Sequence, residues 1–174
     1  KAIRRHLLGE TMVAEGTNGA LDLIRAPEDA LIFQSMATMD KYDAADEIDA
    51  HLSKGHFVVC DRWKQSAVAY GCADGLSAEW LWRVQRLLPQ ADLNILLDIA
   101  PEEAQRRRPV LRDRYEKDRE KQAIVAANYA TMWTRPTGPG RWVKVDGNGT
   151  IEEVGDRIWA QVVDCYRLVA GVQL

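Results

Sequence analysis

An acid and a guanidinium follow one another directly after an apolar run, and this pairing could support phosphate chemistry. Asp61 and Arg62 come next to residues 56–60, which read His-Phe-Val-Val-Cys. Asp61 could hold a hydrated Mg²⁺ or accept a proton, and Arg62 could bind a phosphate through a bidentate fork of N–H donors. A salt bridge that caps a strand is the alternative that so short a match leaves open. Asp61 and Arg62 are therefore candidate site residues.

A second cationic cluster lies further along the chain. Residues 106–121 hold eight of the 23 basic residues, interleaved with four acids. The density predicts a lid over 106–118 that closes on phosphates, excludes water and supplies arginines to a transferring phosphoryl group. The alternative is a solvated helix face held by salt bridges. Pro109 favours the lid, because proline interrupts a helix in the middle of the cluster.

The elements that must position these groups alternate between helix and strand. A short apolar, β-rich run such as 56–60 is typical of a buried strand. The long helix expected from Pro27 places five residues near one face: Leu31, Ile32, Ser35, Met36 and Met39. Alternation of this kind predicts an α/β fold with a parallel β-sheet flanked by helices on both faces. The expected strands are 56–60, 93–98 and 142–145. The expected helices are 1–8, 27–51, 64–70, one capped by Ser77, one opened by Pro101, 119–133 and 150–168, with a loop at 9–26.

Composition places the chain among ordinary globular proteins. It has 174 residues, 47% of them hydrophobic and 28% charged, which predicts a single domain over 1–174. A net charge of −3 argues against general affinity for nucleic-acid polymers or membranes, and no apolar run is long enough to span a bilayer. Cys60, Cys72 and Cys165 lack metal-ligand spacing, which predicts reduced thiols and a cytoplasmic location.

An ordered series of motifs resembles the thymidylate kinase family. Residues 55–70, followed by Gly75-Leu76, are similar to that family's Asp-Arg-(Tyr/His), Ser, Ala-Tyr and Gly-Leu series. Residues 92–104, with Arg107 and then 112–116, resemble its fourth strand and arginine lid. The resemblance covers residues 1–168 and implies a P-loop NTPase-like nucleotide kinase fold. The chain contains no G-x-x-x-x-G-K-[ST] phosphate loop, and its start inside an expected helix predicts that further N-terminal strands precede Lys1.

The resemblance implies ATP-dependent, Mg²⁺-assisted phosphorylation of a deoxynucleoside monophosphate, dTMP in the type case, by a homodimer. Two alternatives stay open: a deoxynucleoside kinase-type phosphotransferase, and a non-catalytic nucleotide-binding or dimerisation module. A buried core side chain is the alternative for the aromatic ring at 33. The implied roles are acceptor phosphate and Mg²⁺ for Asp61, phosphate clamp for Arg62, base stacking for Phe33, pocket lining for Ser66, Tyr70 and Gly71, adenine stacking for Arg107, lid arginines for Arg112 and Arg114, and closure over the substrate for Tyr115.

Several positions depart from the family pattern on the base side of the implied site. Ala37 stands where an arginine is usual, Gly71 where many members have glutamine, and Asp74 where a basic residue is common. Trp63 replaces the commoner tyrosine or histidine. These departures predict that a pyrimidine other than thymine is also compatible with the site.

Overall fold

The computed structural model describes residues 22–107, 118–135 and 140–171. The chain divides into two compact units, one made of Lys1–Pro89 with Arg112–Tyr129 and the other of Gln90–Leu111 with Ala130–Leu174. The single domain expected from the sequence stays a prediction. Within the described ranges, no helix combines the length and the apolar character needed to cross a bilayer.

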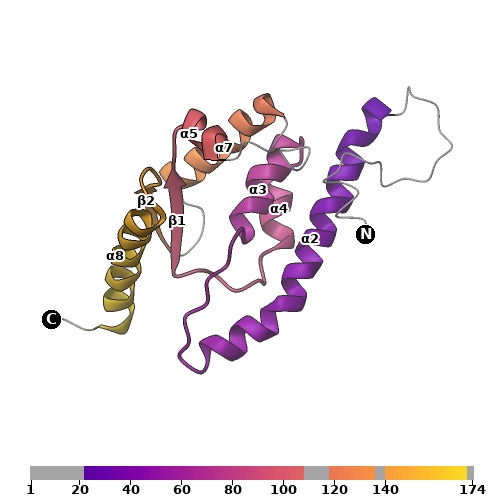
Figure 1. The fold of residues 1–174 in the computed structure, drawn as a ribbon. Helices are drawn as coiled ribbons and strands as arrows, with labels where there is room; N and C mark the ends of the chain where they lie inside the picture. Colours follow the sequence, from indigo (N-terminus) through magenta and orange to yellow (C-terminus); the bar gives the residue numbers. More distant parts are fainter. Residues whose placement is uncertain (1–21, 108–117, 136–139, 172–174) are drawn as a thin grey trace. The chain divides into compact units, whose positions relative to one another are not determined.

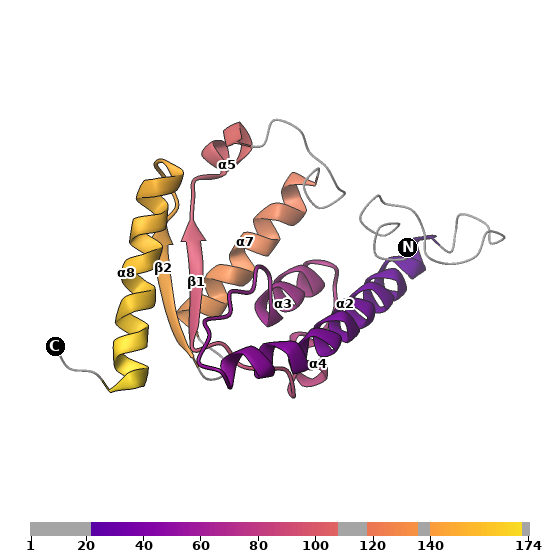
Figure 2. The ribbon, with the colours of Figure 1, turned by 60° about the horizontal axis from the view of Figure 1, so that its bottom comes forward.

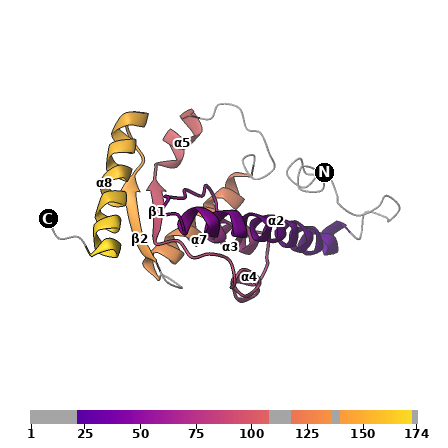
Figure 3. The ribbon, with the colours of Figure 1, turned by 90° about the horizontal axis from the view of Figure 1, so that it is seen from below.

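The second unit contains a two-stranded parallel sheet. Strands β1 (Leu93–Asp98) and β2 (Arg141–Asp146) pair in register from Leu93 opposite Arg141 to Asp98 opposite Asp146. Both arrows point the same way in Figure 2. Helix α8 (Ile151–Ala170) packs against both strands, and it lies along β2 in Figures 1 and 3. These two strands, their parallel pairing and this helix confirm the sequence prediction.

The ends of α8 follow from local chemistry. Thr150 and Glu153 form a capping box, in which each side chain accepts a hydrogen bond from the other residue's backbone N–H. Gly171, with a φ of 65°, ends the helix in the left-handed conformation that glycine adopts without steric cost. Signals at both ends thus set the boundaries of the helix.

The first unit is helical in the part that the structure describes. Helix α3 (Lys64–Ala73) packs against α2 (Asp22–Leu52) and α4 (Ala78–Val84). Ser77 caps α4 by accepting a hydrogen bond from the Trp80 N–H at 3.4 Å. Helix α5 (Pro101–Arg107) belongs to the second unit, and α7 (Arg119–Thr134) contributes residues to both units. With them, all the helices expected after residue 22 are present.

The third predicted strand is wrong. Residues 56–60 form no strand, and the sheet of the described residues contains only β1 and β2. Phe57 is 65% exposed and Val59 is 93% exposed, although a buried strand requires both to be covered. The apolar, β-rich pattern was genuine, but a strand also needs a neighbouring ladder, and neither described strand pairs with this segment.

The prediction for α2 also needs two corrections. Residues 22–26 belong to the helix, whereas the sequence favoured a loop up to residue 26. The buried positions are Ala30, Gln34 and Thr38, while Leu31 and Met39 on the expected apolar face are 41% and 70% exposed. A spacing of four residues places the three buried side chains on one stripe, so the helix buries a small and polar face.

Candidate functional site

Asp61 and Arg62 lie in the turn that leads into α3, and both are exposed. Arg62 has a φ of 61°, a left-handed conformation that costs energy for any residue with a side chain. Its guanidinium lies over the ring of Tyr70 on α3, with the central carbon 5.2 Å from the ring centroid. The strained backbone and the cation–π contact together fix the direction of the guanidinium.

The surroundings of Arg62 keep it strongly cationic. Partial burial by itself lowers its pKa, but Tyr70, Tyr129 and Asp61 outweigh burial and raise the pKa above the ordinary value. The side chain is therefore charged at every pH at which the fold is stable. A fixed, partly desolvated guanidinium suits a phosphate or carboxylate ligand.

The two residues after Arg62 are anchored to the segment that follows α4. Trp63 donates its indole N–H to the Pro89 carbonyl at 3.0 Å, and the Lys64 ammonium donates to the Leu88 carbonyl at 3.2 Å. Lys64 is only 3% exposed, and burial lowers its pKa. These two anchors, which the sequence did not predict, hold the turn at Asp61 and Arg62 against the body of the unit.

Ser66, a predicted pocket residue, has a partner that sequence reasoning missed. Its hydroxyl oxygen lies 2.8 Å from the Tyr129 hydroxyl of α7, within hydrogen-bond distance. Burial raises the pKa of Tyr129, so its hydroxyl remains protonated at neutral pH. The sequence did hold one signal of this contact, the position of Tyr129 in the mostly apolar α7. A buried phenol hydroxyl usually finds a polar partner.

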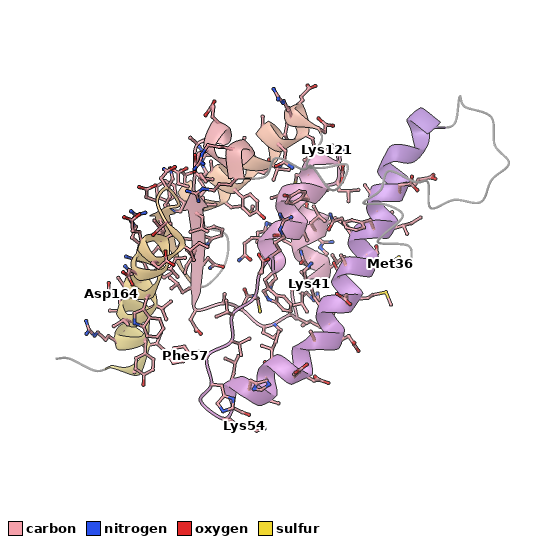
Figure 4. The ribbon with its side chains drawn as sticks, viewed as in Figure 1. Met36, Lys41, Lys54, Phe57, Lys121 and Asp164 are labelled. Carbon is pink, nitrogen blue, oxygen red and sulfur yellow. The ribbon has the colours of Figure 1, made fainter. Side chains whose placement is uncertain are left out.

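Three base-side positions have structural surroundings of their own. Gly71 is buried in α3, where an added Cβ would lie 2.7 Å from the Leu81 Cδ1 of α4. The Asp74 carboxylate, 2% exposed, pairs with the Lys121 ammonium at 2.6 Å; Figure 4 labels Lys121. Phe33 is half-buried on α2, four residues before Ala37. The substrate-binding roles of Phe33 and Gly71 stay predictions.

Arg107 closes α5 in the other unit and is tied to the loop after β2. Its guanidinium donates to the Gly147 carbonyl at 2.9 Å, to the Gly149 carbonyl at 3.0 Å and to Glu103 at 2.7 Å. Arg106 binds the same carboxylate through two donors, at 2.7 Å each. Hydrogen bonds from both arginines hold the pKa of Glu103 at about 2.

The predicted lid begins at Arg106 and Arg107, and both of these arginines form salt bridges with Glu103. At these two positions the structure therefore agrees with the alternative interpretation, a helix face held by salt bridges. Arg112, Arg114 and Tyr115, together with most of the 106–118 segment, lie outside the described residues. Their lid roles stay predictions.

The Arg62 turn offers one candidate metal ligand in the described residues, the Asp61 carboxylate. No cluster of three or more histidine, cysteine, aspartate or glutamate side chains occurs in the described ranges. That carboxylate is exposed and directly precedes Arg62 in the sequence. One carboxylate is sufficient for Mg²⁺ when substrate phosphates and water complete its octahedron.

The second unit, with its parallel strands and α8, has the architecture of an α/β protein. In the first unit, Arg62 is a fixed guanidinium in the turn before α3. The model of the thymidylate kinase family matches residues 8–158, which is most of the chain. The chain therefore belongs to the thymidylate kinase family and has its P-loop NTPase fold.

Curated relatives support the same family. A thymidylate kinase of Thermomicrobium roseum is 32% identical over 154 residues, covering 84% of this chain and 71% of that protein. A probable thymidylate kinase of Pyrococcus abyssi is 42% identical over 83 residues, 47% of this chain and 40% of that protein. A thymidylate kinase of Dictyostelium discoideum is 28% identical over 128 residues, 74% of this chain and 54% of that protein. The chain spans about half the length of several of the relatives that it matches.

Proposed function

We propose that this chain forms part of an enzyme that transfers a phosphoryl group from ATP to a deoxynucleoside monophosphate, with dTMP as the first candidate acceptor. The observation that carries the proposal is Arg62, an exposed guanidinium held in a strained turn against Tyr70. Membership of the thymidylate kinase family supports the same reaction class. Strain of this kind concentrates at ligand-binding sites, where it pre-organises a side chain.

In this proposal Arg62 binds the phosphate of the acceptor nucleotide. Phosphoryl transfer needs two polyanions held in line, so the protein's main contributions are positive charge, positioning and exclusion of water. The anchors at Trp63 and Lys64 keep the turn from moving when the phosphate binds. A pre-organised cation loses little freedom on binding, which favours the charged transition state.

Ser66, Tyr70 and Tyr129 would form the wall beside the nucleotide sugar. The hydrogen bond between Ser66 and Tyr129 gives the wall a fixed polar edge, and the Tyr70 ring is already covered on one face by Arg62. The bulk of Tyr70 would disfavour a 2′-hydroxyl, so a deoxyribonucleotide is the expected acceptor. On the base side, Ala37 offers no hydrogen bond, so we include other pyrimidines as candidate substrates.

Arg107 would stack on the adenine of ATP. Three of its N–H groups, all in the guanidinium plane, are already used by Gly147, Gly149 and Glu103. Hydrogen bonds around the edge leave the flat face available, and arginine faces stack well on aromatic rings. The side chain keeps 35% of its surface exposed. Arg107 is thus better suited to a base than to a phosphate.

A bound Mg²⁺ would neutralise charge on the phosphates of both nucleotides and orient them. Asp61 is the described residue that we assign to it, as a single ligand through its exposed carboxylate. Arg62, next in sequence, would hold the acceptor phosphate beside that ion.

An ADP-release assay on the intact protein tests the proposal, with ATP and Mg²⁺ against dTMP, dUMP, dCMP and the ribonucleotide UMP. We expect turnover with at least one deoxypyrimidine monophosphate and little with UMP. Arg62→Ala should abolish most of the turnover, while Arg83→Ala, a matched change at an exposed arginine of α4, should not. If nucleotides bind but none of the four is phosphorylated, the result would favour the non-catalytic alternative and refute the proposed reaction.

A further inference from the structure

The end of α2 brings two histidines together through its backbone. The Gly55 N–H donates to the Leu52 carbonyl at 2.9 Å, and the His56 N–H donates to the His51 carbonyl at 3.1 Å. Gly55 has a φ of 75°. These two bonds around a left-handed glycine form a Schellman motif, which frequently brings the residue after the glycine against the residue whose carbonyl accepts its hydrogen bond. Here that packed pair is His56 and His51.

The imidazole rings meet through their Nδ1 atoms. The two nitrogens lie 3.0 Å apart, and the ring centroids are 5.3 Å apart. The Nε2 atom of His51 faces the Glu47 carboxylate at 3.9 Å. Which Nδ1 donates and which accepts depends on the tautomers of the two rings. Lys54, which Figure 4 labels just beyond the end of α2, lies between the two histidines in sequence.

We propose that His51 and His56 form a two-histidine site for a divalent transition-metal ion, Cu²⁺ or Ni²⁺. Two imidazoles bound in adjacent positions on such an ion, with metal–nitrogen bonds of about 2.0–2.1 Å, place their nitrogens about 2.9 Å apart. The observed 3.0 Å is close to this separation, and a tetragonal arrangement of nitrogen and oxygen ligands is the geometry of Cu²⁺ and Ni²⁺.

The local surroundings suit metal binding in two further ways. A histidine that ligates a metal usually directs its other ring nitrogen to a carboxylate, and the Glu47 carboxylate lies on the Nε2 side of His51, at 3.9 Å. Both rings are exposed, so each can turn about its side-chain torsions until the two Nδ1 lone pairs converge on one ion. Within the described residues no third ligand joins the pair, so water would complete the coordination and the ion would exchange freely.

Calorimetric titration of the full chain with Ni²⁺ tests the site. We expect one ion to bind, and we expect His51→Gln or His56→Gln to weaken binding by about 10²-fold, because each variant removes the chelate. Glu47→Gln should weaken it by about tenfold through the orientation of His51. His6→Gln and Cys60→Ser are controls for the remaining histidine and for the exposed thiol nearest in sequence, and neither should change the affinity.

The location of the ion can be measured directly by the paramagnetic broadening that bound Ni²⁺ causes in the histidine resonances. Selective broadening of the His51 and His56 imidazole signals is the expected result. Unchanged affinity in both glutamine variants, or loss of binding in Cys60→Ser, would overturn the proposal. Because Arg62 and the nucleotides take no part in this measurement, its outcome is independent of the proposed kinase activity.

Discussion

Replacing Gly71 by alanine tests whether this glycine is set by packing between α3 and α4. Alanine in a helix interior is favoured over glycine by about 1 kcal/mol, so the substitution would stabilise α3 if there were room. There is none, because the new methyl would lie 2.7 and 2.9 Å from the two terminal carbons of Leu81. The Leu81 side chain is fully buried, so it cannot move aside into solvent. Overpacking of this kind costs about 1–3 kcal/mol, so Gly71→Ala should lower the free energy of unfolding by up to about 2 kcal/mol net.

The same reasoning predicts a reversal of sign when Leu81 is shortened. Leu81→Ala alone should cost about 2–5 kcal/mol, because it leaves a cavity. In that background the alanine at position 71 has space, and Gly71→Ala should raise the free energy of unfolding by about 1 kcal/mol. Urea denaturation of the wild type, both single variants and the double variant measures this coupling. An equal cost of Gly71→Ala in both backgrounds would refute the packing argument.

Two further predictions concern charges. Lys121→Met should lower the free energy of unfolding by about 1.5–3 kcal/mol, because it removes a charge-assisted hydrogen bond from the nearly buried Asp74 carboxylate. The exposed Arg83→Met should cost less than about 1 kcal/mol. Similar urea midpoints for the two variants would contradict this. The lowered pKa of Glu103 stabilises the fold above its ordinary pKa of 4.5, and that contribution is lost as the pH falls toward about 2. The difference in stability between the wild type and Glu103→Gln should therefore shrink as the pH falls over this range. Thermal melts at a series of pH values measure it. A difference that grows toward pH 2 would show that Arg106 does not pair with this carboxylate.

The sequence predicted the two strands of the second unit correctly, but it also predicted a strand at residues 56–60, where the structure has none. All three predicted strand segments carry similar apolar runs. Such a run indicates only that a segment could be buried, so it does not show which segments will pair. Residues 93–98 and 141–146 supply each other's ladder partners, and residues 56–60 pair with neither described strand. Pairing depends on contacts distant in sequence, which a local pattern does not contain.

The candidate site shows the same division between local and distant information. The Asp61–Arg62 pair was visible from two adjacent residues. The left-handed φ of Arg62 depends on the folded turn and was not visible. The hydrogen bond from Lys64 to Leu88 joins residues 24 apart, and the contact of Ser66 with Tyr129 joins residues 63 apart. Buried polar side chains on α2, such as Gln34, were missed because helical periodicity treats polar positions as exposed.

The most direct test of the proposed function is the kcat/KM for dTMP of the intact protein and of Arg62→Ala, measured at saturating ATP with Arg83→Ala as the matched control. The account predicts that Arg62→Ala lowers kcat/KM by about 10³-fold, the scale on which one decisive arginine acts in phosphoryl transfer. It also predicts that Arg83→Ala stays near the wild type and that all three proteins unfold at similar urea concentrations. If Arg62→Ala keeps a kcat/KM within about threefold of the wild type, Arg62 does not bind the acceptor phosphate and the proposed site is wrong.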